Sequence, residues 1–141
     1  MGFHLTDDMD QLRDIMIKKV ITIDRDRNAQ DAARTMADHE IGSLVVVSDG
    51  RPIGIVTERD LVRKVCTKDV VSSKIPLTDI MSSPVISAEP DTPIEIAVQR
   101  MFNNKIRRLI IMENGNLVGI VTVSDLAKYV RTRSIIDKMF D

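Results

Sequence analysis

Two short segments place a hydroxyl and a carboxylate at the same spacing: Thr57-Glu58-Arg59-Asp60 and Thr122-Val123-Ser124-Asp125. Each follows an apolar, strand-like run and precedes a helix-like segment. The N-terminus of a helix offers unpaired N–H groups and the positive end of the helix dipole, which favour a phosphate. A carboxylate can accept both hydrogen bonds of a ribose cis-diol, as in dinucleotide-binding folds. The spacing therefore indicates two candidate ribose-phosphate sites.

The same Thr-x-x-Asp spacing is also typical of a helix cap. In a cap the threonine side chain accepts a hydrogen bond from a backbone N–H, and the acidic side chain accepts one from the N–H of the cap residue. A ligand can recruit groups that also cap a helix, so the two interpretations are compatible. The residues alone leave both open.

The elements around these segments occur twice, at an offset of 65 residues. Leu12–Met16 returns as Leu77–Met81, and Gly54–Thr57 returns as Gly119–Thr122. Residues 12–65 and 77–130 share 19 identities in 54 positions without a gap. Such self-similarity indicates an internal duplication.

Each copy predicts the element order β-α-β-β-α. An amphipathic helix follows a short first strand, and two apolar strands then flank Asp49-Gly50 or Asn114-Gly115, dipeptides that favour a tight hairpin turn. A second helix is predicted to begin near Asp60 and Asp125, and Thr92–Glu95 has the pattern of a capping box. The predicted strands are Val20–Ile23, Leu44–Val47 and Ile53–Val56 in the first copy, and Val85–Ser87, Leu109–Met112 and Leu117–Val121 in the second.

The continuous apolar strands are typical of a sheet that is covered on both faces. We therefore expect an α+β fold in which the two tandem repeats pack with pseudo-two-fold symmetry into one compact module. The expected division is residues 1–74, with a lead-in helix over Thr6–Met16 and the first repeat, and residues 75–141, with the second repeat and a C-terminal helix.

Composition narrows the classes of protein. The 141 residues carry 20 basic and 21 acidic side chains, so there is no basic field for nucleic acid or a membrane surface. No stretch has the apolar length of a membrane span, and the start lacks the pattern of a signal peptide, so we expect a cytoplasmic protein. His4, His39 and Cys66 lack partners at metal-ligand or catalytic spacing, which predicts neither a metal site nor an enzyme.

In order and twice over, these features resemble the CBS-domain pair, or Bateman module. The resemblance covers residues 10–131 and rests on Asp14-Ile15-Met16, on Asp79-Ile80-Met81, on the apolar hairpins and on both Gly-x-x-Thr-x-x-Asp segments. It implies a stand-alone sensor of adenosyl ligands such as AMP, ADP, ATP or S-adenosylmethionine, and no other required cofactor.

The resemblance also implies which residues contact the ligand. In such modules the aspartate binds ribose and the hydroxyl residues bind ribose or phosphate. One site would then combine Thr122, Ser124 and Asp125 with Met16, Ile21, Ile41 and Gly42, and its mirror site would combine Thr57, Arg59 and Asp60 with Met81, Ile86 and Ile106.

The two sites differ in charge. Leading into the second strand, the first repeat has Gly42-Ser43 where the second has Arg107-Arg108. A basic residue at this point contacts the ligand phosphate in related modules, so Arg107 or Arg108 would favour a charged nucleotide at the Asp125 site. A strand-end arginine is equally compatible with a solvated or locally paired side chain.

The sequence and the resemblance are compatible with two functions of different classes. The first is regulation by an adenosyl ligand, with an effect on a separate protein partner or on the chain's own oligomeric state. The second is a structural interaction module that forms a homodimer through its helices, around Thr6–Met16 and Leu126–Phe140, while its clefts stay empty. The sequence decides neither the ligand and its number, nor the regulated target, nor whether a dimer is head-to-head or head-to-tail.

Overall fold

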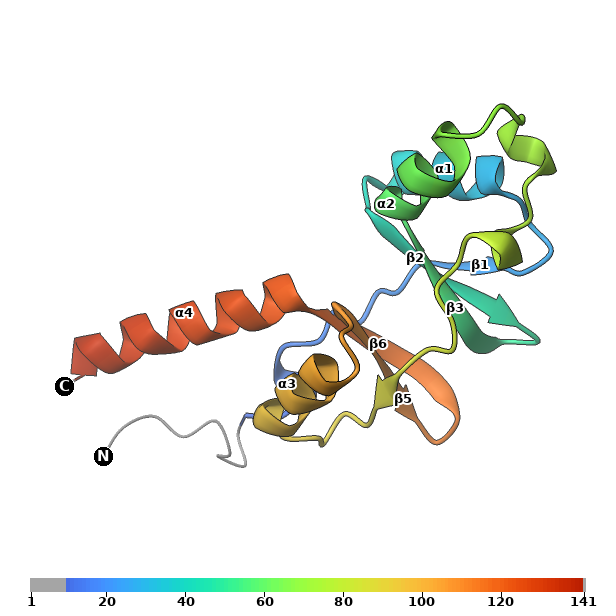
Figure 1. The fold of residues 1–141 in the computed structure, drawn as a ribbon. Coiled ribbons are helices and arrows are strands. Elements are labelled where there is room, and N and C mark those ends of the chain that lie inside the picture. Colours follow the sequence, from blue (N-terminus) through green and yellow to red (C-terminus); the bar gives the residue numbers. More distant parts are fainter. Residues whose placement is uncertain (1–9, 141) are drawn as a thin grey trace. The chain divides into compact units, whose positions relative to one another are not determined.

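A computed structural model of the chain describes residues 10–140. Their elements follow the predicted order, β-α-β-β-α twice (Figure 1). The elements of the first repeat are β1 (Thr22–Asp24), α1 (Ala29–His39), β2 (Ser43–Ser48), β3 (Arg51–Thr57) and α2 (Glu58–Leu61). Helix α2 continues into a π-helical turn at Val62–Cys66. The elements of the second repeat are β4 (Ser87–Ala88), α3 (Ile94–Asn103), β5 (Arg108–Glu113), β6 (Asn116–Thr122) and α4 (Val123–Phe140).

Each repeat forms a three-stranded sheet, with the orders β1-β2-β3 and β4-β5-β6. The first strand pairs parallel to the second, and the second and third form an antiparallel hairpin. Asp49-Gly50 and Asn114-Gly115 all have positive φ, as a two-residue hairpin turn requires. The hairpins and the α+β class are confirmed. The short first strands start two residues later than predicted.

The middle strands explain why the apolar runs are continuous. In β2, Leu44 and Val46 belong to the repeat's core cluster, and Val45 points to the opposite face but is also buried. In β5, Leu109, Ile110 and Ile111 repeat this pattern with no exposed surface. The middle strand of each sheet is therefore buried on both faces, as its continuous apolar run predicts, whereas Thr22 and Asp24 of β1 are exposed.

The compact units of the chain differ from its sequence repeats. Residues 20–85 form one unit, here called the Asp60 unit. Residues 10–19 and 86–140 belong to the other, here called the Asp125 unit. The segment before the first strand of each repeat, residues 10–19 and 75–85, is here called its lead-in segment. Each lead-in segment therefore packs on the body of the opposite repeat. Leu12 is buried in the core with α3 and β5, and Leu77 and Ile80 are buried in the core with α1 and β2.

The lead-in segments act as an additional antiparallel edge. Ile17 pairs with Ile120 of β6 through two backbone hydrogen bonds of 2.9 and 3.0 Å, and Ser82 pairs with Ile55 of β3 in the same way, at 2.9 and 3.0 Å.

The predicted lead-in helix is wrong over the described part of Thr6–Met16, where only a 3-10 turn at Leu12–Asp14 is present. The N–H of Leu12 donates to Thr92 O, just before α3, so this N–H bonds to a distant segment instead of to a carbonyl within a local helix. Thr6–Met9 lie outside the described residues.

The first long helices of the two repeats begin differently. Asn28 caps α1: its side chain accepts from Asp31 N and the Asp31 carboxylate accepts from Asn28 N. The capping box predicted at Thr92–Glu95 is wrong, because α3 has no side-chain cap and Ile94 N donates to Asp10 O of the lead-in segment. A distant backbone carbonyl therefore satisfies this helix terminus.

Candidate functional site

Thr122 and Asp125 are joined where β6 ends and α4 begins. Asp125 Oδ2 accepts hydrogen bonds from Thr122 N at 2.9 Å and from Thr122 Oγ1 at 3.0 Å, and Asp125 N donates to Thr122 Oγ1 at 3.2 Å. Both side chains are half-buried. The threonine and the aspartate thus hold one another in a fixed orientation at the helix N-terminus.

Thr57 and Asp60 form the same arrangement at the end of β3. The three corresponding distances are 2.9, 3.0 and 3.1 Å, and Thr57 is the N-cap of α2. The helix-capping interpretation of the motif is therefore confirmed for both copies. Capping occupies Oδ2 of each carboxylate and leaves Oδ1 for another partner.

The two carboxylates differ in what contacts Oδ1. Lys64 Nζ lies 3.3 Å from Asp60 Oδ1 and also donates to Ile80 O at 3.0 Å. The equivalent of Lys64 in the second repeat is Tyr129. Among residues 10–140, Asp125 Oδ1 has no hydrogen-bond or ion-pair partner. Sequence reasoning missed this difference, although a comparison at the 65-residue offset pairs lysine with tyrosine.

The positions leading into β2 and β5 lie beside these helix termini. Val123 N donates to Arg107 O at 3.0 Å, and Glu58 N donates to Gly42 O at 3.0 Å. Arg108 is opposite Thr122 in the sheet register. Arg107 is exposed, whereas Arg108 is half-buried and makes contacts of its own. The structure therefore brings the arginine pair next to Thr122 and Asp125, with Arg107 as the more accessible member.

Met16 and Met81, both predicted as site residues, contact the strand glycines of the motif. A Cβ on Gly119 would lie 2.7 Å from Met16 Sδ, and one on Gly54 would lie 2.5 Å from Met81 Sδ. The groups that approach each glycine are the methionine side chain of the lead-in segment and a backbone carbonyl of the next residue, Ile17 O at Gly119 and Ser82 O at Gly54. The contact docks that segment at the strand that carries the Thr-x-x-Asp motif.

The other predicted residues are divided between the units. Met16, Ile86, Ile106 and the arginine pair belong to the Asp125 unit, and Met81, Ile21, Ile41 and Gly42 belong to the Asp60 unit. The predicted Asp125 site therefore takes Ile21, Ile41 and Gly42 from the other unit, and the predicted Asp60 site takes Ile86 and Ile106 from the other unit. Ser124 and Arg59 are exposed beside their aspartates.

A buried acid holds α4 to the lead-in segment. Asp10 is only 5% exposed, and its Oδ2 lies 4.0 Å from an Arg133 guanidinium nitrogen. Burial and a hydrogen bond with Asp10 raise the pKa of Tyr129 well above its usual range. Tyr129 and Arg133 lie one turn apart on α4, so the lead-in segment contacts the helix that begins at the Asp125 site.

Residues 10–140 were compared with the features of a membrane span and of a metal site. No helix among them is long and apolar enough to cross a membrane. The same residues contain no group of three or more histidine, cysteine or acidic side chains arranged to hold a metal ion.

Comparisons with known proteins agree with the repeat. The CBS domain family matches residues 12–67 and 77–132. A protein of Methanopyrus kandleri is 44% identical over 111 residues, which cover 77% of this chain and 57% of that protein. The CBS domain-containing protein YhcV of Bacillus subtilis is 35% identical over 119 residues, which cover 84% of each chain.

Similar solved structures include one with bound ligands. It is the CBS domain pair of protein MJ0100 in complex with 5′-methylthioadenosine and S-adenosyl-L-methionine. Its TM-score is 0.76 at 26% identity, and the match covers 87% of this chain and 97% of that one. Two matched repeats, the duplicated elements and the shared topology lead to one conclusion: the chain belongs to the CBS domain family and carries a tandem pair of CBS domains.

Proposed function

We propose that this chain is a regulatory module, not an enzyme, and that it binds an adenosine-containing ligand at Asp125. The observation that carries the proposal is the state of the two carboxylates. Asp125 is oriented by Thr122 through Oδ2 and has Oδ1 available, whereas Asp60 Oδ1 is engaged by Lys64. A ribose diol needs an oriented carboxylate with a free oxygen, so Asp125 is the better acceptor.

Arg107 provides the charge at the same end of the unit. Its backbone is hydrogen-bonded to the first residue of α4, and its side chain is exposed. A guanidinium there favours a ligand with an anionic group, either the phosphate of AMP, ADP or ATP or the carboxylate of S-adenosylmethionine. The similar CBS pair that binds S-adenosylmethionine and methylthioadenosine supports the adenosyl part of the proposal.

Thermal unfolding with a panel of AMP, ADP, ATP, S-adenosylmethionine, methylthioadenosine and GTP tests the proposal. A ligand at about 100 times its dissociation constant stabilises the folded state by about 2.7 kcal/mol. We expect a rise in Tm with at least one adenosyl compound and none with GTP. No rise with any adenosyl compound would contradict the proposal.

Asp125→Ala and Asp60→Ala form a matched pair, because each removes the carboxylate of the same capping arrangement; Asp60→Ala in addition removes the ion pair with Lys64, which contributes about 0.5 kcal/mol. Both should lower the Tm without ligand by a similar amount. Only Asp125→Ala should abolish the ligand-induced rise. Equal losses of the rise in both variants would argue against a preference for Asp125.

Self-association is a second candidate function, and a specific observation favours it. Apolar side chains of α3 and α4 are exposed on one surface, including Phe102 at 82%, Val130 at 49% and Val98 at 41%. Contiguous apolar surface of this kind is typical of interaction sites. The output of ligand binding is then a change in the chain's own assembly or in its contact with a separate protein.

A further inference from the structure

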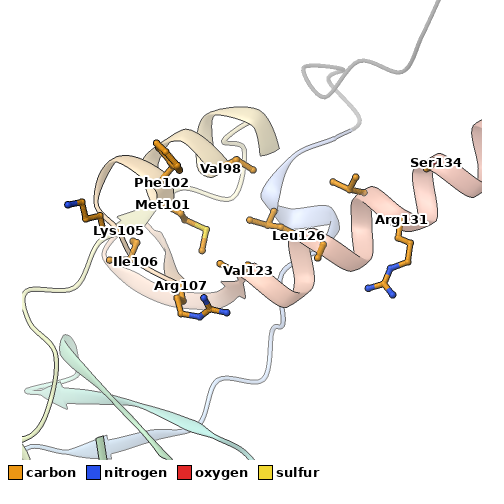
Figure 2. Close-up of a pocket in the computed structure, with 12 residues that line it drawn as sticks. Val98, Met101, Phe102, Lys105, Ile106, Arg107, Val123, Leu126, Arg131 and Ser134 are labelled. Carbon is orange, nitrogen blue, oxygen red and sulfur yellow. The ribbon is translucent and has the colours of Figure 1, made fainter. Parts of the chain in front are cut away.

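The cavities of the two units differ in chemistry. A groove of about 1050 Å³ lies between α3 and α4 in the Asp125 unit, and the apolar side chains of Met101 and Leu126 project into it (Figure 2). A smaller cavity of about 400 Å³, here called the Arg25 cavity, lies in the Asp60 unit. Most of its lining side chains are charged or carry a hydroxyl group: Arg25, Asp26, Arg27, Ser73, Lys74 and Thr78. None of them belongs to a Thr-x-x-Asp motif.

A fixed turn presents the two arginines to the cavity. The turn follows β1, where Arg27 N donates to Asp24 O at 3.1 Å and Asp26 N donates to Asp24 Oδ1 at 3.0 Å. These two bonds are typical of a β-turn that an aspartate side chain stabilises. Arg25 N donates to Val47 O of β2 at 2.9 Å, which ties the turn to the sheet. Backbone bonds therefore hold the turn and leave both arginine side chains for another partner.

The opposite wall is the segment that contains Lys74. Ala29 N, at the start of α1, donates to Ile75 O at 2.9 Å, and Asn28 forms an antiparallel bridge with Pro76. These contacts hold Lys74 beside the turn, although the two segments are far apart in the sequence. Because the first N–H of α1 is used in this pairing, the positive charge of the cavity comes from side chains and not from the helix terminus.

The positive side chains of the Arg25 cavity lack internal partners. Arg25, Arg27 and Lys74 are exposed, and within residues 10–140 none of their side chains forms a hydrogen bond or an ion pair. Asp26 is the one acidic residue of the lining, and its carboxylate has no such partner in the described part of the chain. The lining therefore has a net charge of +2 that is open to an anion from solvent.

The second repeat shows that the fold does not require these cations. Its segments pair in the same way, because Gln11 forms a bridge with Pro93 and Ile94 N donates to Asp10 O. At the 65-residue offset, the residues that correspond to Arg25, Arg27 and Lys74 are Pro90, Thr92 and Met9. All three cations are thus additions to a backbone pairing that forms without them. Structural need does not account for them, whereas binding of an anion does.

We propose that the Arg25 cavity binds a phosphate group, carried either by free orthophosphate or by a small organic ester. A phosphate dianion matches the net charge of the lining. The two guanidinium groups can donate paired hydrogen bonds to its oxygens, and Lys74 adds a point charge. The hydroxyl groups of Ser73 and Thr78 are further donors. The site is separate from the ligand site proposed at Asp125, because its residues lie in the other unit.

Asp26 distinguishes the two sources of phosphate. Its carboxylate repels a free phosphate ion, but it accepts hydrogen bonds from the hydroxyl groups of an ester. If glycerol phosphate binds at least about threefold more tightly than orthophosphate, the cavity is a site for an ester, and the reverse order assigns it to the free ion. Asp26→Asn should strengthen orthophosphate binding, because the repulsion is removed. An unchanged orthophosphate affinity in this variant would contradict the placement of the ion beside Asp26.

Amide chemical shifts of the isotope-labelled full chain measure the binding of orthophosphate and of glycerol phosphate at a constant ionic strength set with chloride. We expect saturable shifts at Arg25, Arg27 and Lys74, and none at Asp91 and Thr92, where the second repeat lacks the cations. Absence of saturable shifts at the three cations with both probes would overturn the proposal. Titration with the adenosyl panel reports the Asp125 site through the amides of α4, so failure of one proposal is distinguishable from failure of the other.

Removal of the cations tests their role directly. The variant Arg25→Gln, Arg27→Gln, Lys74→Gln should raise the Kd of the tighter-binding probe at least about tenfold, because it removes the charge-assisted contacts. Lys74→Gln alone leaves the turn intact and should raise this Kd at least about threefold. The three side chains are exposed and unpaired, so the fold should be preserved. An unchanged Kd in both variants would overturn the proposal.

A matched control separates a local site from the general charge of the unit. Arg34→Gln, Arg63→Gln, Lys68→Gln removes the same charge from exposed positions of the Asp60 unit that do not line the cavity. Its Kd should stay within about twofold of the wild-type value, because charges in water are strongly screened. An equal loss of affinity in the two triple variants would show attraction to the unit as a whole and would overturn the proposal.

Discussion

Lys64 and Asp60 form an ion pair across one helical turn, with Nζ 3.3 Å from Oδ1. The pair sits at the N-terminus of α2 and engages the carboxylate oxygen that the cap leaves available. In the second repeat, tyrosine replaces the lysine and Asp125 keeps that oxygen available. This single difference gives two otherwise equivalent motifs different capacities for a ligand.

Lys64→Met should add ligand binding at Asp60. The substitution keeps most of the side-chain length and releases Asp60 Oδ1 from its ion pair. We expect calorimetric titration to give a stoichiometry of one adenosyl ligand per chain for the wild type and of two for the variant. An ion pair at this spacing in a helix contributes about 0.5 kcal/mol to stability, and this one is partly open to solvent on the lysine side, so the fold should be preserved. An unchanged stoichiometry would show that the lysine does not decide between the sites.

Gly119→Ala should destabilise the fold through a clash with Met16. The added Cβ would lie 2.7 Å from Met16 Sδ and 3.2 Å from Ile17 O. Overpacking of this kind costs about 1–3 kcal/mol, which urea unfolding can measure. The double variant Gly119→Ala, Met16→Ala should recover part of the loss, because the thioether is the nearest obstacle. Purely additive effects of the two substitutions would argue against the contact.

Tyr129 should resist ionisation in the folded chain. Burial and a hydrogen bond with Asp10 raise the pKa of Tyr129, so the folded state holds the phenolic proton more tightly than the unfolded state. The stabilisation from this group is therefore complete below the unfolded value of about 10 and is lost as the pH rises above it. Tyr129 is the only tyrosine and the chain has no tryptophan. Phenolate absorbance should therefore appear at a higher pH in native than in urea-unfolded protein.

Tyr129→Phe is the control for that titration. The variant should lose the part of the alkaline decrease in unfolding free energy that the phenol causes. Coincident titration of native and unfolded wild-type protein would contradict the buried contact with Asp10.

Asn28→Ala and Thr92→Ala should differ in their effect on stability. The Asn28 side chain accepts a cap hydrogen bond from Asp31 N, so its loss should cost about 1 kcal/mol. Thr92 makes no side-chain cap bond to α3, whose first N–H is bound by Asp10 O, so its loss should cost less than about 0.5 kcal/mol. Urea unfolding of both variants measures the difference in unfolding free energy. Equal losses in the two variants would indicate that the Thr92 side chain caps α3.

Much of the fold could be predicted because its signals are local. The hairpins follow from Asp49-Gly50 and Asn114-Gly115 between apolar runs, and the helices follow from apolar residues at helical spacing. The Thr-x-x-Asp caps are also local, since donor and acceptor lie three residues apart. The lysine at position 64 was within reach of the same reasoning, because it lies four residues after Asp60 and faces the same side of the helix.

The sequence by itself therefore determined the duplication, the order of the elements, the Thr-x-x-Asp spacing of both motifs and the difference in charge between Arg107-Arg108 and Gly42-Ser43. Only the tertiary structure decided that each lead-in segment packs on the opposite repeat, that Met16 contacts Gly119 and that Asp10 satisfies the N-terminus of α3. The physical reason is the length of chain between the partners. A strand edge or a helix end accepts any suitably placed backbone group, and no local pattern states which distant segment provides it.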